Sequence, residues 1–421
     1  MKKICILATI LFLCVTCRKE ADFYPYYGET HKLAYDSYAG QFETVWKNIS
    51  TGYVFWSLDT TDWDAVFDRY MPEFMDLDSR YANGETIETK ELEALYTSAM
   101  GGLIDHHMNI RIYNIHNSTG STQFFSLRPG RIETAKRDYY IENDTLSMLS
   151  FLDGIEAEED ITIGNHLKAD ANINGTDVVY HYFKILLDDG RIIPYMWQSK
   201  AYITPVIKAI DKPEDSNWNA AVLIDTWLKD VATTPRDRLA GFILDNRSNR
   251  GGYQDDLDLL VGSFINEEKI ILQTRYKEGP GRLEYSPWVD YKQKPDMRYH
   301  RDITAENIPY VILCDINSIS MGEIETIVAN AVLPTVYTIG ERTYGATGPL
   351  QSDMIDLVYD GIFGNRNEGH YVYTSTFQAR PYGGEILEGK GYTPDQIVNR
   401  KDYNGNYAPQ LKAAISYIAQ H

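Results

Sequence analysis

The second half of the chain alternates short apolar runs of strand character with segments of helical periodicity. The expected order is strand, helix, strand, helix, strand, helix and strand, at Arg191–Tyr202, Ala220–Leu228, Leu239–Asp245, Asp256–Phe264, Tyr310–Cys314, Met321–Val332 and Thr335–Ile339. Strands separated by helices of this length form layered cores, because each helix covers a face of the sheet. We therefore expect an α/β fold whose core spans residues 190–421.

The first half of the chain has a different character. Between Phe42 and Met108, apolar and aromatic residues recur at three- and four-residue spacing, which is typical of helices. We expect residues 39–116 to form an N-terminal helical subdomain with the tryptophans in its core. Residues 117–189 contain short β-type runs, Asp138–Ile141 among them, interrupted by Asn-Gly, Asp-Gly and Pro-Gly turns. We interpret them as an inserted β-rich module.

Residues 1–17 have the pattern of a bacterial lipoprotein signal. Two lysines precede an apolar run of roughly twelve residues, which is short of the about twenty that a bilayer requires. The run ends in Leu-Cys-Val-Thr-Cys17, which resembles a lipobox, so Cys17 is the expected lipidation site; an ordinary secretory signal is the alternative. Residues 18–38 would then be a polar tether. We expect a protein anchored by its acyl chains in a bacterial envelope, on the periplasmic or cell-surface side of the outer membrane.

Charge and motif content exclude several classes of partner. The chain has 40 Lys and Arg against 60 Asp and Glu, a net charge of -20, which disfavours nucleic acids and anionic lipid surfaces as partners. It has no Gly-rich phosphate loop of the Walker type, so a nucleotide cofactor is not expected. Asp105, His106 and His107 are adjacent, and adjacent side chains rarely converge on one ion, so no metal is expected either.

A candidate nucleophile lies between an expected strand and an expected helix. Residues Asn317–Glu323 read Asn-Ser-Ile-Ser-Met-Gly-Glu. A hydroxyl at such a turn, here that of Ser320, has the backbone N–H groups of the first helical turn and the positive end of the helix dipole beside it. The alternative is a capping box, in which Ser320 and Glu323 only terminate the helix.

Further motifs occur in a fixed order along the chain. They read Asp62-Trp63-Asp64, Leu103-Ile-Asp105-His106-His107, Asp245-Asn-Arg-Ser-Asn249-Arg-Gly251-Gly252, Ser318-Ile-Ser320-Met-Gly-Glu323, Gly340-Glu-Arg-Thr343-Tyr-Gly345 and Glu388-Gly-Lys-Gly391-Tyr-Thr-Pro394-Asp395. Together they resemble the S41 family of serine peptidases, the C-terminal processing or tail-specific peptidases, and more closely its tricorn-like and retinoid-binding-protein-like branch. The resemblance implies a ClpP/crotonase-like layered core. It also implies a PDZ module, for which residues 117–189 are the divergent candidate, without a Gly-Leu-Gly-Phe-like loop.

The resemblance assigns the roles of the catalytic residues. Ser320 falls on the nucleophile, and Ala346 stands where the processing peptidases have the lysine of a Ser-Lys dyad. The tricorn-like branch uses a histidine from the helical subdomain instead, and His107 falls on that position. Glu388 matches the acidic residue that would orient this histidine. His106 is a rival base.

Two further assignments complete the expected site. Asp105 is the alternative residue to orient the imidazole. The oxyanion hole would be formed by the backbone N–H of Met321 together with that of Gly251 or Gly252, because glycines let the main chain approach a substrate closely.

The sequence thus predicts an envelope-anchored serine endopeptidase that hydrolyses proteins or peptides through an acyl-enzyme, without a cofactor. The alternative is a non-catalytic relative that binds a peptide or a small apolar ligand on the same scaffold. The missing dyad lysine and the altered Asp-His-His segment favour this alternative, whereas the intact Ser320, Gly251, Gly252 and His107 favour the enzyme.

Overall fold

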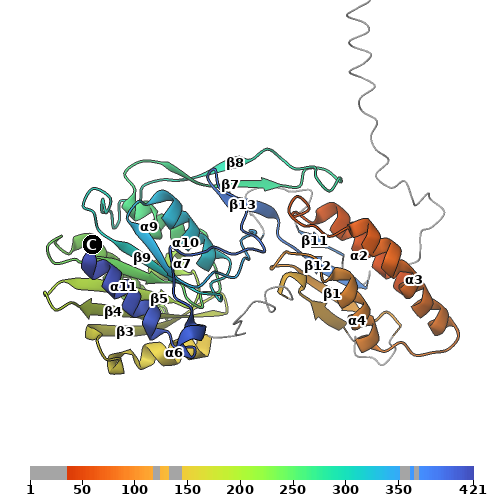
Figure 1. Ribbon diagram of the computed structural model, residues 1–421, viewed down its shortest axis with the longest axis horizontal. Coiled ribbons are helices and arrows are strands. Elements are labelled where there is room, and N and C mark those ends of the chain that lie inside the picture. The colour runs from red at the N-terminus through yellow and green to blue at the C-terminus, as the bar shows by residue number, and fades with distance from the viewer. Residues whose placement is uncertain (1–35, 117–123, 132–144, 351–360, 365–368) are drawn as a thin grey trace, which may run out of the picture.

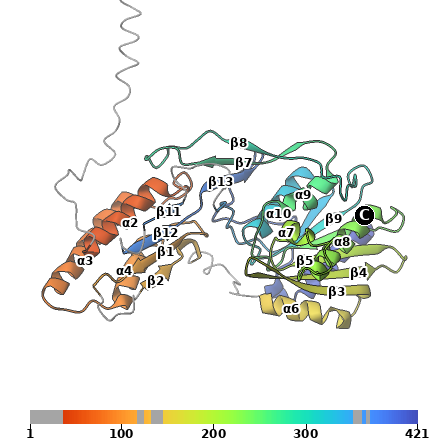
Figure 2. The same ribbon diagram turned by 180° about the vertical axis from the view of Figure 1, so that it is seen from behind.

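The computed structural model describes residues 36–116, 124–131, 145–350, 361–364 and 369–421. These residues form two lobes that are bridged by a β-ribbon (Figures 1 and 2). Residues 1–35, with Cys17 and most of the expected tether, lie outside the described part of the chain, as do Asp138–Ile141. Among the described helices, none is both long enough and apolar enough to cross a membrane.

The helical lobe packs three helices against a small antiparallel sheet. The helices are α2 (Tyr38–Gly52), α3 (Trp63–Ala82) and α4 (Thr89–Met100), and the sheet has the order β11 (Ile362–Phe363), β12 (His370–Tyr373), β1 (Asn109–Tyr113) and β2 (Phe124–Leu127). Asp62 caps α3 by accepting a hydrogen bond from the Ala65 N–H, as is common for Asp at this position. Trp46 and Trp63 are buried, and each indole N–H donates to the carbonyl of the other residue. The prediction that the tryptophans form the core is confirmed.

The α/β lobe is built on a seven-stranded mixed sheet. Its strand order is β14 (Gln396–Ile397), β10 (Val336–Gly340), β9 (Tyr310–Cys314), β6 (Phe242–Asp245), β5 (Ile192–Gln198), β4 (Thr176–Leu186) and β3 (Thr162–Ile173). Neighbouring strands from β14 to β5 are parallel, whereas β5, β4 and β3 are antiparallel.

Helices cover both faces of this sheet, as the alternating pattern predicts. One apolar core involves α7 (Ile203–Ile207), α8 (Trp218–Thr233), α9 (Asp256–Leu260), the short η3 (Gly262–Phe264) and α10 (Met321–Val332). The core on the opposite face involves α6 (Thr145–Asp153), η2 (Ile155–Ala157) and α11 (Ala408–Gln420), and η5 (Arg400–Tyr403) precedes α11. The expected strand at Tyr310–Cys314 and helix at Met321–Val332 occur with the predicted bounds. The single helix expected at Asp256–Phe264 is instead interrupted at Val261, whose φ of -125° leaves the helical region.

The ribbon that bridges the lobes consists of β13 (Phe377–Pro381), β7 (Lys269–Tyr276) and β8 (Val289–Gln293), in that order. Its tip reaches the helical lobe, where the Tyr285 hydroxyl accepts from the Ser57 N–H and Arg282 forms an ion pair with Asp64. The ribbon therefore couples the two lobes.

The described part of residues 117–189 is not a separate module. β2 belongs to the sheet of the helical lobe, whereas β3 and β4 extend the main sheet beyond β5. The interpretation as an inserted, PDZ-like module is therefore wrong for these strands. Turn residues show where a strand ends, but the partner of a strand depends on contacts far along the chain.

The expected boundary at residue 190 does not separate the two lobes of the structure. β11 and β12 come from the C-terminal half, yet β12 pairs with β1 in the helical lobe, with Ile110 opposite Val372. Both lobes therefore contain segments from both halves of the sequence.

Candidate active site

Ser320 stands at the turn between β9 and α10, with a backbone that non-glycine residues rarely adopt. Its φ is 58° and its ψ is -122°, which costs free energy, on the order of 1–3 kcal/mol, unless the surrounding structure enforces it. Strained serines at strand-to-helix turns are typical of hydrolase nucleophiles, because the turn lifts the hydroxyl out of the main chain. The side chain is half-buried.

The structure contradicts the capping alternative for Ser320. Ser320 occupies the N-cap position of α10, but its side chain makes no capping hydrogen bond. Glu323 does not return to the start of the helix either, since its Oε1 accepts from the backbone N–H groups of Gly345 and Ala346. The Ser320 hydroxyl is therefore not used to end the helix.

The loop after β6 lies directly against this turn. Asn249 O accepts from the Ile319 N–H at 2.9 Å. A Cβ added to Gly322 would come within 2.6 Å of Asn249 O, and one added to Gly251 within 2.6 Å of Ser320 Cβ. Only residues without a side chain permit this close approach.

Two backbone N–H groups remain available beside Ser320. The Gly251 N–H donates to Asn249 Oδ1 at 2.9 Å, so it does not serve as a donor to substrate. Within the described residues, the N–H groups of Gly252 and Met321 have no hydrogen-bond partner. Gly252 is exposed, and Met321 opens α10. Of the two glycines expected in an oxyanion hole, Gly252 is therefore the one whose N–H is not already engaged.

The histidine segment precedes β1 and meets the C-terminal part of the chain. Ligand-type atoms of Asp105, His107 and Glu388 lie within 4.8 Å of one another. Glu388 Oε1 accepts from the backbone N–H of His106 at 2.9 Å and lies 3.6 Å from His106 Nδ1. The structure thus brings both histidines and both expected acids together.

Both carboxylates in this group are saturated with hydrogen bonds. Asp105 accepts from the N–H groups of His107, Met108 and Ser375 and from the hydroxyls of Thr374 and Ser375. Glu388 accepts from the N–H groups of His106, Thr347 and Gly348 and from the Thr347 hydroxyl. A carboxylate offers about four lone-pair sites, so these acids are held in fixed positions.

This arrangement corrects the argument that adjacent residues do not converge on an ion. Asp105 and His107 do converge with Glu388, because the Asp105 carboxylate turns the chain by binding the N–H groups two and three residues ahead. The donors around both carboxylates already take up the lone pairs that a metal would need. The two acids therefore act on His107 through their charge, since its Nδ1 has no hydrogen-bond partner among the described residues.

The electrostatics of the group favour the neutral form of His107. Burial lowers the pKa of His107, while the charges of Glu388 and Asp105 oppose this shift only in part. Burial, and then the charge of Glu388, raise the pKa of Asp105. Burial also acts to raise the pKa of Glu388, but its hydrogen bonds and the charges of His106 and His107 bring the net value below the usual one. A neutral imidazole beside an ionised carboxylate is the form that a general base requires.

One loop connects the histidine group to the nucleophile turn. The Tyr344 N–H donates to Ser318 O at 3.2 Å, and the Tyr344 ring contacts that of His106 edge-on, with centroids 4.9 Å apart. Further along the loop, Ala346 is buried, where the processing peptidases have their dyad lysine. Residues 347 and 348 then bind Glu388.

Other predicted residues have structural roles. Arg247 is fully buried and forms an ion pair with Asp245 while donating to Tyr407 O and to Gln410. Asp395 accepts from the N–H and the hydroxyl of Thr338 and so ties a C-terminal turn to β10. Both residues therefore fix loops.

Two groups of site residues were missed in the sequence. Thr374 and Ser375 hold Asp105, and Tyr344 covers His106. The run Thr374-Ser375-Thr376 is a visible signal, because clustered hydroxyls after a strand can satisfy a buried acid. The sequence around Tyr344 contains no comparable signal for the contact of this residue with His106.

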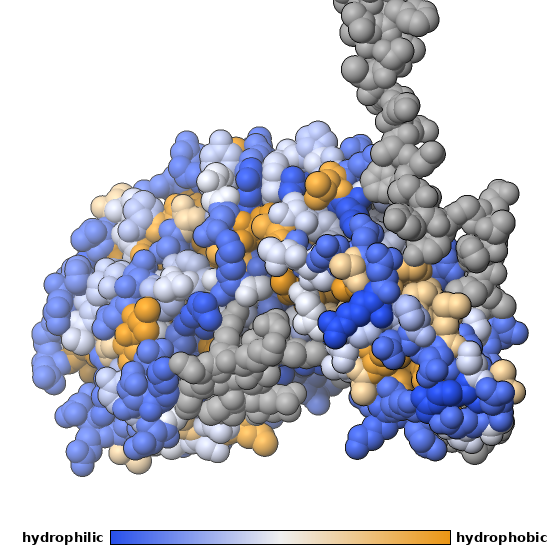
Figure 3. Space-filling view, turned by 45° about the vertical axis from the view of Figure 1, so that its right-hand side comes forward, coloured by the Kyte–Doolittle hydropathy of each residue, from blue (hydrophilic) through white to orange (hydrophobic). Residues whose placement is uncertain are grey.

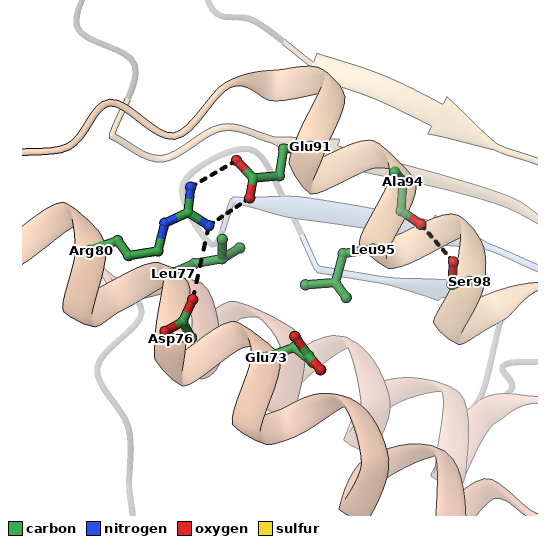
Figure 4. Close-up of a pocket in the computed structure, with 8 residues that line it drawn as sticks. All are labelled: Glu73, Asp76, Leu77, Arg80, Glu91, Ala94, Leu95 and Ser98. Atoms are coloured by element: carbon green, nitrogen blue, oxygen red, sulfur yellow. Dashed lines mark hydrogen bonds and ion pairs between the residues drawn. The ribbon is translucent and has the colours of Figure 1, made fainter.

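A hollow of ≈ 290 Å³ opens elsewhere, between α3 and α4 (Figure 4). It is lined by Glu73, Asp76, Leu77, Arg80, Glu91, Ala94, Leu95 and Ser98. Arg80 is tied to Asp76 and Glu91 across it. No residue of the Ser320 or His107 group lines this hollow, so we do not associate it with catalysis.

Comparisons with known proteins match part of the chain to one family. The model of peptidase family S41 matches residues 215–398, which include Ser320, both glycines and Glu388. No protein of curated function matched the sequence.

Solved structures share the fold at low identity. A protein from Parabacteroides merdae described as a candidate peptidase has 18% identity and a TM-score of 0.58, covering 91% of this chain and 96% of its own. Mature CPAF complexed with lactacystin has 11% identity and a TM-score of 0.54, covering 92% and 98%. Mature CPAF in a further structure has 10% identity and a TM-score of 0.51, covering 90% and 96%. Residues 215–398 of this chain are thus similar to peptidase family S41.

Proposed function

We propose that this protein is a serine endopeptidase that hydrolyses proteins or peptides through an acyl-enzyme. The observation that carries the proposal is the strained Ser320, whose hydroxyl does not cap α10, together with the unpartnered N–H groups of Met321 and Gly252. The saturated Asp105 and Glu388 around a neutral His107 supply the second half of the machinery.

In the proposed reaction, His107 takes the proton of Ser320 while the hydroxyl oxygen attacks the scissile carbonyl. Negative charge then develops on the carbonyl oxygen, where the N–H groups of Met321 and Gly252 and the helix dipole stabilise it. The resulting imidazolium gives its proton to the leaving amine, and the nearby Glu388 carboxylate stabilises the imidazolium. Water repeats the sequence on the acyl-enzyme and releases the acid product.

The alanine at position 346, where the processing peptidases have their dyad lysine, favours a histidine as the base. Ala346 is buried and cannot accept a proton. His106 contacts Glu388 and Tyr344 and is almost fully buried, whereas His107 is half-buried. Greater exposure favours His107 as the ring that reaches substrate, with His106 as part of the supporting structure.

The central experiment is covalent labelling of the purified soluble part with a fluorophosphonate. Wild-type protein is expected to label at one site and to hydrolyse a peptide library, and Ser320→Ala is expected to lose both activities. Ser98→Ala removes a hydroxyl of the helical lobe, which donates to Ala94 O, and should label normally. If the wild type neither labels nor hydrolyses peptides, the peptidase proposal is wrong.

One observation favours a second function, that of a binding protein on the same scaffold. Alanine replaces the dyad lysine at position 346, which disables the Ser-Lys reaction of the processing peptidases. Such a protein would bind a peptide or a small apolar ligand, and Ser320→Ala would leave that binding unchanged. The labelling experiment distinguishes the two functions.

We further propose that the protein is anchored in the bacterial envelope through an acylated Cys17 and acts on substrates there. The support is the lysine-led apolar run that ends at this cysteine. Cys17→Ser should leave the protein unprocessed or release it from the membrane fraction. Normal processing with unchanged membrane retention would exclude a lipid anchor at this residue.

A further inference from the structure

Two histidines face each other on the first two strands of the main sheet, on the side covered by α6 (Figure 1). In the pairing of β3 with β4, His166 lies opposite Phe183 and Lys168 lies opposite His181. The two histidines are therefore diagonal neighbours on one face, which long side chains can bridge. His166 Nε2 and His181 Nδ1 are 3.2 Å apart.

The outer nitrogen of each ring faces a carboxylate. His166 Nδ1 lies 3.6 Å from Glu156 Oε1, and His181 Nε2 lies 3.8 Å from Asp153 Oδ1. An imidazole has a tautomer in which the outer nitrogen, on the carboxylate side, carries the hydrogen and the inner nitrogen bears a lone pair. At 3.2 Å, the two inner nitrogens either share one hydrogen or, with both lone pairs free, can bind one cation between them.

We propose that this pair, on β3 and β4, is a binding site for a divalent transition-metal ion such as Zn²⁺. Zinc binds imidazole nitrogen at about 2.0–2.1 Å, so two nitrogens on one tetrahedral ion are about 3.3 Å apart. The measured separation of 3.2 Å matches this value. Imidazole ligands suit zinc, copper and nickel rather than magnesium or calcium.

The surroundings of the pair agree with this assignment. Metal-bound histidines commonly donate their other N–H to a carboxylate, which fixes the ring and raises its basicity, and Glu156 and Asp153 lie on that side of the rings, 3.6 and 3.8 Å away. Asp153 is also paired with Lys168 at 2.8 Å, which limits it to an outer position. His181 is fully buried, whereas the side chain of His166 is 21% exposed. Water can thus reach the ion from the His166 side and complete its coordination.

The protonation state of His181 also suits a metal ligand. Burial, together with the charges of His166 and Lys168, lowers its pKa to about 4. The imidazole is therefore neutral at pH 7, the form in which nitrogen binds a metal. This site shares no residue with the Ser320 and His107 groups, so it does not depend on the proposed peptidase activity.

The test uses the tag-free, metal-stripped full chain. Isothermal titration with Zn²⁺, and visible absorption with Co²⁺ as a spectroscopic probe, are expected to show one site that His166→Ala removes. Glu156→Gln changes an exposed side chain that does not hold the fold, and it should weaken Zn²⁺ binding by about 10- to 100-fold. His421→Ala, at the exposed C-terminal end, should bind as the wild type does.

A second variant separates this site from the acid–histidine group of the candidate active site. His107→Ala should retain the Zn²⁺ site, because the proposed ligands are His166 and His181. Loss of binding in His107→Ala, with binding intact in His166→Ala, would assign the ion to the Asp105, His107 and Glu388 group and overturn the proposal. Absence of any Zn²⁺ binding by the wild type would mean that a shared proton joins the two rings and would overturn it equally.

Discussion

At Ser320, the backbone carries the clearest sign of function. The residue adopts a positive φ, which costs free energy, yet its hydroxyl does not cap α10. The stability of the helix therefore does not explain why a serine occupies this position. At Asp105 and Glu388, by contrast, the hydrogen bonds of both carboxylates are complete. The chemistry of the site is divided between one strained residue and several rigidly held ones.

The two neighbouring histidines should be distinguishable by kinetics. His107→Ala is expected to lower kcat/KM by a factor on the order of 10²–10⁴, the usual contribution of a general base, whereas His106→Ala should cost clearly less. The measurement is peptide hydrolysis by each purified variant, with matching circular dichroism spectra as the folding control. The reverse order of effects would move the base to His106.

The pH dependence of kcat/KM gives an independent check. Burial lowers the pKa of His107, so the enzyme should lose activity only as the pH falls below the usual histidine range near 6.5. The charge of Glu388 acts in the opposite direction, because it raises this pKa. Glu388→Gln should therefore move the acidic limb to still lower pH while reducing the maximum rate. An acidic limb above pH 7 would contradict this assignment.

At the level of single elements, the loop after β6 shapes the candidate site because it packs directly against the turn at the start of α10. Asn249 connects the two segments, since its carbonyl binds Ile319 and its side chain binds Gly251. The loop can approach in this way only because glycine occupies position 251, where φ is 82°. Gly251 is thereby brought against Ser320.

A pair of glycine substitutions separates backbone strain from contact with Ser320. Gly175 has the same φ of 82°, but a Cβ there would meet no atom within 4 Å, whereas a Cβ on Gly251 would meet Ser320 Cβ at 2.6 Å. Gly175→Ala should lower the free energy of unfolding by about 1 kcal/mol and leave the labelling rate unchanged. Gly251→Ala should in addition slow fluorophosphonate labelling by about 10-fold or more, because a small displacement of reacting groups is costly. Equal labelling rates in the two variants would show that the contact has no catalytic consequence.

For the molecule as a whole, the candidate site depends on how the two lobes are joined. His107 and Asp105 come from the helical lobe and Ser320 comes from the α/β lobe, with the β7–β8–β13 ribbon between the lobes (Figure 2). The surface in Figure 3 is mostly hydrophilic, in keeping with the net charge of -20. We infer that specific contacts at the ribbon tip help to fix the position of one lobe relative to the other.

This inference predicts a local effect of Arg282→Ala. Arg282 forms an ion pair with Asp64, donates to the Ser50 hydroxyl, and lies over the rings of Trp46 and Trp56. The substitution should speed hydrogen exchange at residues 276–286 and lower kcat/KM. Arg298→Ala breaks an ion pair with Asp296, two residues away in the sequence, and serves as the control. Unchanged exchange in Arg282→Ala would show that the ribbon tip is held by other contacts.

The sequence alone determined what depends on neighbours in the chain. The periodicity of apolar residues placed β9 and α10 with their observed bounds, and the position of Ser320 at the turn between them followed from that order. The turn at Asn174-Gly175 was visible for the same reason. Local propensity and hydrophobic pattern act over one or two turns of chain.

Tertiary structure alone decided which distant segments meet. Glu388 reaches the backbone of His106 across 282 residues of sequence, and β3 and β4 joined the main sheet instead of a module of their own. The choice of Gly252 over Gly251 likewise depended on a side chain, Asn249, whose direction no pattern reveals. Sheet partners and buried hydrogen bonds depend on the packing of the whole chain, because a buried polar group must find its partner wherever the fold brings one near.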